Sequence, residues 1–305
     1  MTKPLDVGRY RAWFSEATPV IAGVASADNA IALWSDWLAE LARAHRTREF
    51  GERFARFCPA PGAHAQDYYP EELQLCDDLW VFAGINKDTD FFVRVYAQSR
   101  SLDVDEYASV GTALSARFGL FSPRGVRWWF VAEQPLPGID VSHATRLVVS
   151  SLPHTSPDPV GLRQVRAPDA DFHAAYAAIY ERFYAAQPHM RDVVRTETHD
   201  ALRASARAGG LFAYEVDGEL AGVFAAMPGE QPPVRGWCAV EAVLDTPFQG
   251  VGLAPRALGE MFSRLSVRQH RAVWATIAGI NTPSRRSAAR VGMLDAGGWL
   301  TLASL

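Results

Sequence analysis

A glycine-containing segment near residue 250 has the residue types and spacing of an anion site. Phe248 to Pro255 reads Phe-Gln-Gly-Val-Gly-Leu-Ala-Pro, after an apolar stretch and before a segment with helical spacing. The first N–H groups of a helix have no partner within it, and the helix dipole favours negative charge there. Gly250 and Gly252 carry no Cβ, so a phosphate can approach the backbone closely. The segment predicts a phosphate site, and an ordinary strand-to-helix turn is the alternative.

Two other phosphate-binding loops do not fit this segment. A Walker loop requires Gly-Lys-Ser/Thr, which the segment lacks. A dinucleotide fingerprint requires a third glycine near residue 255, where this chain has Pro255, and it opens a domain rather than lying late in one.

The motifs on either side of this segment favour a phosphate site over an ordinary strand-to-helix turn. Gln249 to Ala254 matches the Gln/Arg-x-x-Gly-x-Gly/Ala signature of the GNAT N-acyltransferases. Asn281-x-x-Ser284 and Gly292-Met293 resemble the next motif of that superfamily, with Met293 in place of the usual Phe. Glu241 stands where members carry an acidic residue near the end of the fourth strand. The chain thus resembles a GNAT enzyme over residues 160–305.

This resemblance implies transfer of an acyl group, most simply acetyl from acetyl-CoA, directly to an amine in a ternary complex. It implies that backbone N–H groups of the glycine loop, residues 249–254, bind the pyrophosphate, and that the pantetheine arm pairs with the strand end. The predicted coenzyme A contacts are Val243, Leu244, Gln249, Gly250, Val251, Gly252, Leu253, Ala254, Asn281 and Arg285.

The resemblance also suggests the catalytic groups. An amine is mostly protonated at neutral pH and must lose a proton to attack, so Glu241 is the candidate general base, acting through water. The alternative is a strand carboxylate that binds a cation. Members often protonate the thiolate with a Tyr, but Ala288 stands there in this chain, so Ser284 and Asn281 complete the catalytic set that we predict.

The sequence says less about the amine that accepts the acyl group than about the acyl-CoA that donates it. In the family the first two helices shape the amine pocket, here residues 180–196, but aromatic side chains at helical spacing more often belong to a core than to a pocket. Three functions remain open. These are acetylation of a primary amine on a small molecule, acetylation of a protein or peptide, and a non-catalytic coenzyme A-binding regulatory module.

The elements that must position these residues follow from hydrophobic periodicity. Residues 160–305 read as β-α-α-β-β-β-α-β-α-β, with Asp217-Gly218 as a hairpin turn and residues 193–208 containing the second helix. Residues 1–152 repeat a helix-helix-hairpin-helix-strand order without the glycine loop. The prediction is an α+β chain of two domains joined by a proline-rich linker at 153–159. The C-terminal domain is a GNAT fold with a mixed, mostly antiparallel sheet flanked by helices. The N-terminal α/β domain is GNAT-like, degenerate and non-catalytic, with an unrelated α+β domain as the alternative.

The charge and the cysteine and histidine content argue against some classes of partner. The 305 residues carry a formal net charge of −4 without long runs of one sign, which argues against nucleic-acid binding. Three cysteines without a Cys-x-x-Cys pair and scattered histidines predict no disulfide framework and no metal site. We expect a cytoplasmic enzyme without a signal peptide or membrane span, a monomer or homodimer, acting on a small-molecule amine.

Overall fold

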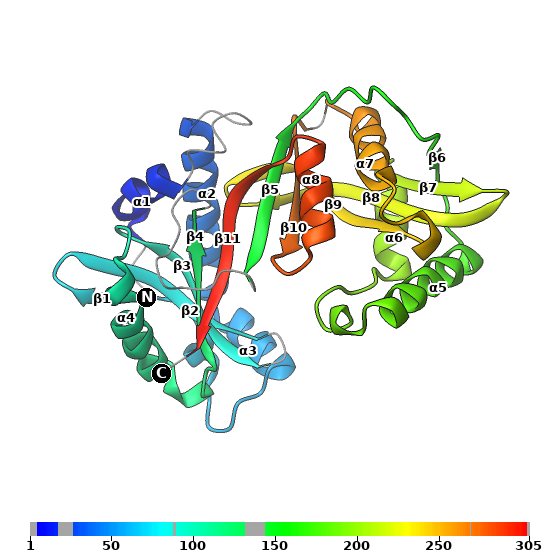
Figure 1. Cartoon of the computed structure of the whole chain (residues 1–305). Helices are drawn as coiled ribbons and strands as arrows, with labels where there is room; N and C mark the ends of the chain where they lie inside the picture. The colour runs from blue at the N-terminus through cyan, green and yellow to red at the C-terminus, as the bar shows by residue number, and fades with distance from the viewer. Residues whose placement is uncertain (1–4, 18–26, 88–89, 132–143, 269, 304–305) are drawn as a thin grey trace. The chain divides into compact units, whose positions relative to one another are not determined.

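The computed structural model describes residues 5–17, 27–87, 90–131, 144–268 and 270–303. These residues form two compact units, each described by itself here (Figure 1). The first unit contains the N-terminal elements and the end of the last strand, and the second contains the elements from Thr145 to Ala296.

The first unit is built around a sheet with strand order β1-β2-β3-β4-β11. All of these neighbours are antiparallel except β3 and β4, which run parallel. Its elements are η1 (Val7–Tyr10), α1 (Arg11–Ala17), α2 (Ala27–His45), α3 (Arg48–Phe57), η3 (Ala65–Tyr68), β1 (Glu71–Cys76), β2 (Leu79–Lys87), β3 (Phe91–Gln98), α4 (Val104–Arg117), η4 (Gly119–Phe121), β4 (Gly125–Phe130) and β11 (Leu294–Ala303).

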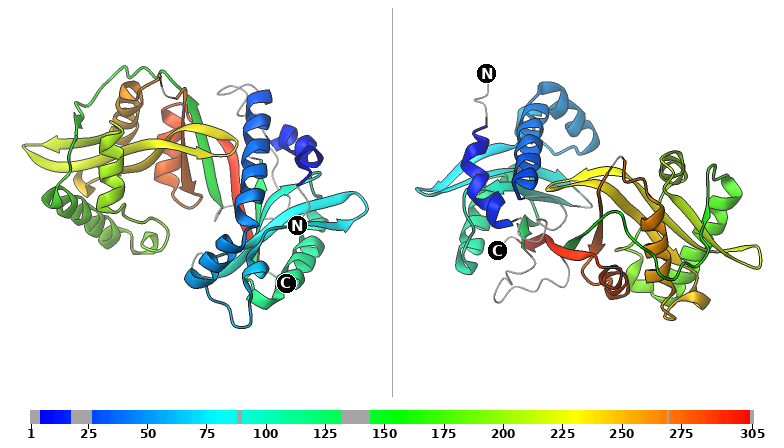
Figure 2. Two further views of the ribbon diagram at one scale, coloured as in Figure 1. Left: turned by 180° about the vertical axis from the view of Figure 1, so that it is seen from behind. Right: turned by 90° about the horizontal axis from the view of Figure 1, so that it is seen from above.

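The second unit has strand order β6-β7-β8-β9-β10-β5, and only β9 and β10 are parallel. The long strands β8 and β9 are the yellow ribbons in both views of Figure 2. The elements are β5 (Thr145–Ser151), β6 (Arg163–Gln164), α5 (Ala170–Ala186), η5 (Pro188–Met190), α6 (His199–Arg207), β7 (Leu211–Val216), β8 (Glu219–Gln231), β9 (Val234–Leu244), η6 (Thr246–Phe248), α7 (Leu253–Arg264), β10 (Ala272–Ala278) and α8 (Thr282–Arg290).

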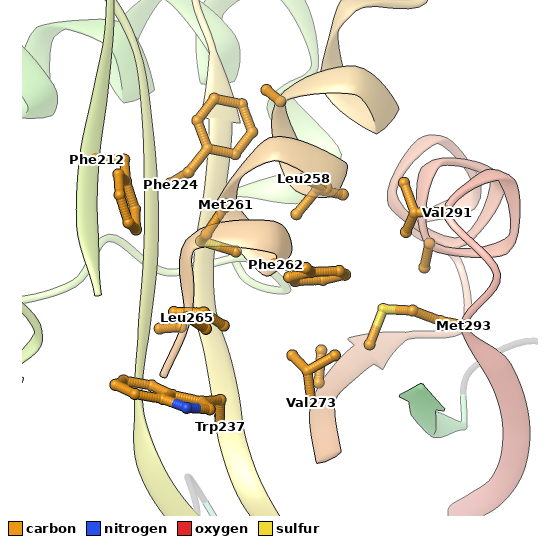
Figure 3. Close-up of a cluster of buried hydrophobic side chains, with 14 of the residues drawn as sticks. Phe212, Phe224, Trp237, Leu258, Met261, Phe262, Leu265, Val273, Val291 and Met293 are labelled. Carbon is orange, nitrogen blue, oxygen red and sulfur yellow. The ribbon is translucent and has the colours of Figure 1, made fainter. Parts of the chain in front are cut away.

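Alternating side chains of the second sheet build two separate cores. Phe212, Phe224 and Leu244 pack with α7 and α8 in one cluster, where Phe262 and Met293 lie beside Val273 (Figure 3). The intervening residues on the same strands, among them Ala213, Val223 and Val243, pack with α5 and α6 in the other. Because successive strand residues face opposite sides, helices cover both faces of one sheet.

The fold class predicted from the sequence is confirmed. Both units are α+β with mixed, mostly antiparallel sheets, and the first repeats the order hairpin, helix, parallel strand of the second. The Asp217-Gly218 turn joins β7 to β8, with φ of 53° and 85° at the two residues. Residues 1–4, 18–26, 88–89, 132–143, 269 and 304–305 of the two predicted domains lie outside the described residues.

The second helix predicted within residues 193–208 is α6, which begins only at His199 because residues 193–198 form a loop. Tyr184 donates to the Val194 carbonyl at 2.6 Å, and the Glu197 N–H donates to Tyr176 at 2.7 Å. Backbone groups that a helix would use are thus bonded to tyrosine hydroxyls, and Thr198 caps the helix that follows.

Two strands also differ from the sequence prediction. The strand predicted to open the second domain is only the two residues of β6, and just before it the Glu260 carboxylate accepts the N–H groups of residues 160–162 at 2.7–2.9 Å. β1 is not predicted from the sequence, because its Glu and Gln residues hide the alternation of an edge strand.

The division into units differs from the division at residues 152–160 that we inferred from the prolines. β5 precedes the prolines but pairs along its whole length with β10 of the second unit. β11 follows α8 in the chain but pairs from Gly298 to Ala303 with β4 of the first unit. Each unit is therefore completed by a strand from the other half of the sequence.

Candidate functional site

The parallel strands β9 and β10 separate shortly after they meet. They pair only at Trp237 with Val273 and at Cys238 with Trp274. β9 then continues to Leu244 along β8, and β10 continues to Ala278 along β5. The edge of β9 that faces the opening therefore offers N–H and C=O groups to a partner outside the sheet.

A pocket of about 800 Å³ occupies this opening. Its walls are residues 239–244 of β9, residues 275–278 of β10, the glycine loop with the start of α7, one face of α8, and part of α5 with the loop after it. The pocket lies entirely within the second unit, so one rigid sheet positions its walls.

The glycine loop forms one end of the pocket. Gly250 and Gly252 have φ of +78° and +80°, a region that other residues rarely adopt, and a Cβ at either position would meet nothing within 4 Å. Backbone conformation, not crowding, therefore requires the glycines. Gly252 is the N-cap of α7 and makes no side-chain cap bond, and the first turn contains no acidic residue. The first N–H groups of α7 are thus left for an anion.

Side chains fix the base of this loop. Gln249 donates from Nε2 to the Leu244 carbonyl at 2.7 Å, which closes the turn between β9 and α7. Asp245 accepts from the Thr246 N–H at 2.8 Å and pairs with Arg182 of α5 at 2.8 Å. These contacts explain why a Gln opens the signature: its amide holds the loop against the strand end.

Most of the predicted site residues line the pocket, and two do not. Val251 is 72% exposed, and Arg285 donates to the Gly279 carbonyl at 3.2 Å instead of facing the pocket. Arg286 and Arg290 of α8 line the pocket, so the geometry favours Arg286 over Arg285 as a phosphate contact. The predicted residues that do line it are Glu241, Val243, Leu244, Gln249, Gly250, Gly252, Leu253, Ala254, Asn281 and Ser284.

Glu241 lies at the pocket wall and is only 6% exposed. The register between β8 and β9 shifts beside it, leaving Val240 as an extra residue of a bulge that turns Glu241 toward α5. Its carboxylate accepts hydrogen bonds from the hydroxyls of Tyr176 and Tyr180 and, at 2.8 Å, from the Ala242 N–H. Burial raises the pKa of Glu241 to about 7, and the tyrosine hydrogen bonds limit the rise.

Tyr176 is not among the site residues predicted from the sequence, and Tyr180 is predicted only as one of the aromatic side chains of residues 180–196. Both are buried, and Tyr180 also lines the pocket. The available signal was the spacing of Tyr176, Tyr180 and Tyr184, four residues apart on one face of α5. That spacing predicts a row of hydroxyls, but the sequence does not say that a carboxylate of β9 lies opposite.

Helix α8 supplies the other polar groups of the pocket. Asn281 is its N-cap, and its Oδ1 accepts from the Ser284 N–H at 3.3 Å. Ser284, Ser287 and Ala288 line the pocket, and Ala288 also packs in the core cluster beneath α8. The hydroxyl that a Tyr would supply at position 288 is therefore absent from this helix face.

The corresponding strands of the first unit also separate, after Arg94 and Arg127, but their opening is filled. Trp128 stands where the second unit has Ala275, and its buried ring meets Tyr107 edge-on at 5.2 Å. At the start of α4 the Glu106 carboxylate accepts the Asp103 N–H at 2.8 Å and pairs with Arg100 at 2.7 Å. Carboxylates thus occupy the helix end where an anion would bind.

No family model matches the sequence, and no curated protein matches it. Solved structures do match. They include GNAT acetyltransferases. One from Colwellia psychrerythraea is 11% identical and covers 74% of this chain and 81% of its own, at a TM-score of 0.46. A GCN5-related N-acetyltransferase from Sphaerobacter thermophilus is 15% identical and covers 86% and 90%, at 0.45.

A third solved structure matches nearly the whole chain. It is a tandem GNAT protein from the clavulanic acid biosynthesis pathway, 14% identical, covering 98% of this chain and 95% of its own at a TM-score of 0.40. At these identities the likeness concerns the fold alone and gives no substrate. The fold of each unit is therefore assigned from its own sheet: an antiparallel hairpin, a helix, and a parallel strand that separates from its neighbour.

Two other features are absent from the part of the chain that the structure describes. No group of three or more His, Cys, Asp or Glu side chains there is arranged to hold a metal ion. None of the described helices combines the length and apolar character needed to cross a membrane.

Proposed function

We propose that the protein is an acyl-CoA-dependent N-acyltransferase that transfers acetyl from acetyl-CoA to a primary amine of a small molecule. The observation that carries the proposal is the continuity of one pocket. It joins the free N–H groups of the glycine loop, the open edge of β9 and the buried carboxylate of Glu241.

The residues present fit acetyl-CoA. The N–H groups at the start of α7 would bind its pyrophosphate, and Arg286 and Arg290 add positive charge at the same pocket. Beyond Cys238 the edge of β9 at Val243 and Leu244 is not paired with β10, although Gln249 already occupies the Leu244 carbonyl, and this edge suits the amide groups of the pantetheine arm. When bound there, acetyl-CoA supplies the acetyl group as a thioester, and a backbone N–H of β9 is available to the thioester oxygen.

The other end of the pocket suits an amine. Glu241 is the only carboxylate among the lining residues, and a base with a pKa of about 7 is ionised to a useful extent at neutral pH. Phe183, Val193 and Val194 give this wall an apolar surface beside Gln187 and Arg195, and a small organic amine can pack against it.

Calorimetry and a thiol-release assay test the proposal together. We expect acetyl-CoA to bind one site per chain. At least one member of a panel of small amines should be acetylated, with release of the coenzyme A thiol. Glu241→Gln should lower turnover about 100-fold or more, the usual contribution of a general base. Glu219→Gln, an exposed carboxylate at the start of β8, should have no effect.

The outcomes separate the alternatives. Turnover of peptides but not of small amines would replace the small-molecule acceptor with a protein. Binding of acetyl-CoA without turnover on either panel would favour a non-catalytic regulatory module, for which Ala288 in place of a Tyr is the supporting observation.

A further inference from the structure

The two tyrosines that donate to Glu241 differ in what else they contact. The oxygen of Tyr176 also accepts the Glu197 N–H at 2.7 Å, and Tyr176 does not line the pocket. Tyr180 lines the pocket and lies 2.9 and 3.0 Å from the two carboxylate oxygens. Among the described residues none donates a hydrogen bond to the Tyr180 oxygen. Its lone pairs are therefore available to a molecule in the pocket.

Glu241 itself offers little direct access. Three donors, two hydroxyls and the Ala242 N–H, already approach its two oxygens. The side chain is almost fully buried, whereas a base must come within hydrogen-bond distance of the proton that it removes. Tyr180 both donates to this carboxylate and lines the pocket.

We propose that Tyr180 is a catalytic residue that contacts the acceptor amine and relays its proton to Glu241. The inference rests on the proposed function and names the atom through which the base acts. As the C–N bond forms, the nitrogen loses a proton to the Tyr180 oxygen, and the Tyr180 hydrogen passes to the Glu241 carboxylate. The C–S bond breaks with its electron pair on sulfur, which takes a proton from water. Glu241 then returns its proton to solvent, so protons and charge balance.

The surroundings favour a relay in which Tyr180 never becomes a free anion. Burial and the neighbouring Glu241 charge raise the pKa of Tyr180 far above its ordinary value, so its proton leaves only as another arrives. The other titratable groups near the pair are Tyr176 and Tyr184 on α5, Glu197 in the loop before α6 and Cys238 on β9. None of these supplies a positive charge that would stabilise a tyrosinate.

Removing single hydroxyls tests the relay, because the row of tyrosines on α5 provides matched controls. The dependence of kcat on pH is measured for the parent, Tyr180→Phe, Tyr176→Phe and Tyr184→Phe. Tyr180→Phe and Tyr176→Phe each remove a hydrogen bond that lowers the pKa of Glu241, so both should shift the acidic limb to higher pH. Only Tyr180→Phe should also lower the plateau about 100-fold, and Tyr176→Phe should lose less than tenfold.

Tyr184 contacts Val194 rather than Glu241, so Tyr184→Phe should keep the parent's pH profile. The parent should show a solvent isotope effect with a curved proton inventory, because two protons move together, and Tyr180→Phe should lose the curvature. An acetyl-CoA affinity equal to the parent's would show that Tyr180→Phe is folded.

Failure of the relay can be told from failure of the proposed function. If the plateau of Tyr180→Phe falls no further than that of Tyr176→Phe, the relay is overturned while amine acetylation stands. If Glu241→Gln matches a parent that acetylates an amine, the relay to Glu241 is overturned and amine acetylation stands. If the parent turns over no amine, both are overturned.

Discussion

A single buried carboxylate, Glu241, links the chemistry of the pocket to the stability of the fold. Its oxygens lie among tyrosine hydroxyls in an otherwise apolar cluster between β9 and α5. Burial favours the neutral acid, and this raises the pKa of Glu241 to about 7. Glu241 is therefore about half ionised near pH 7, where a general base is useful. Ionising it fully costs folding free energy.

The first prediction concerns this cost. A carboxyl whose pKa is higher in the folded state than in the unfolded state contributes stability at low pH that is lost as pH rises through the folded value. Between pH 4.5 and pH 7 the parent should lose about 3 kcal/mol relative to Glu241→Gln, taking about 1.4 kcal/mol per pKa unit. Urea unfolding of both proteins across this range measures the difference. A difference that does not change with pH would contradict the raised pKa.

The second prediction separates two adjacent arginines on α8. Arg286 lines the pocket and has no ion-pair partner among the described residues, whereas Arg285 donates to the Gly279 carbonyl. Arg286→Ala should weaken acetyl-CoA binding about tenfold at low salt and less at high salt, the usual effect of losing one charge-assisted contact. Arg285→Ala should change it less than threefold. Calorimetry measures both, and equal effects would remove Arg286 from the phosphate site.

Residue types and spacing could predict the glycine loop, because its function lies in a continuous stretch of backbone. Glu241 could be named from its place in a strand. The tyrosines that surround it could not be assigned, because Tyr176 and Glu241 lie far apart in the sequence and only the packing of α5 against β9 brings them together. Arg286 and Arg285 could not be separated either, since only the rotation of α8 decides which one faces the pocket.

At the scale of elements, the side chains that follow the separation of two parallel strands decide whether a pocket or a packed core forms there. Small residues, Ala239 and Ala275, follow the last paired positions in the second unit. Val95 and Trp128 occupy the corresponding positions in the first unit and are buried. The element order could be predicted from hydrophobic periodicity. The loop at residues 193–198 could not, because hydroxyls of a preceding helix hold it out of the helical conformation.

The third prediction is that a tryptophan placed between β9 and β10 fills the opening of the second unit. Ala275→Trp should place an indole in the opening between the strands, as Trp128 does in the first unit, and acetyl-CoA binding should fall at least 100-fold. Ala275→Leu should have an intermediate effect. Acetyl-CoA titration measures the loss, and the melting temperature controls for misfolding. Unchanged binding to a folded Ala275→Trp protein would show that the donor does not enter between β9 and β10.

At the scale of the whole molecule, the chain exchanges strands between its halves. β5 completes the second sheet beside β10, and β11 completes the first beside β4. The proline-rich segment suggested a simple boundary because local composition marks it well. The sequence could not indicate the exchange, since strand partners are chosen by packing and both strands have ordinary apolar patterns.

The fourth prediction follows from this exchange. A fragment of residues 160–305 lacks β5 and leaves the long edge of β10 unpaired, so it should aggregate. A fragment of residues 145–305 keeps β5 and should be more soluble and bind acetyl-CoA. Soluble yield and circular dichroism compare the two fragments. Equal behaviour would mean that β5 contributes little to the second unit.

The most direct test of the account is hydrogen exchange of the backbone amides with and without acetyl-CoA. Bound donor should protect the amides of residues 250–254 at the start of α7, together with the free edge of β9 at residues 239–244, and should leave the closed opening of the first unit unchanged. Protection absent from both of these segments, or confined to the first unit, would contradict the central claim that the second unit holds the acyl donor between β9 and β10.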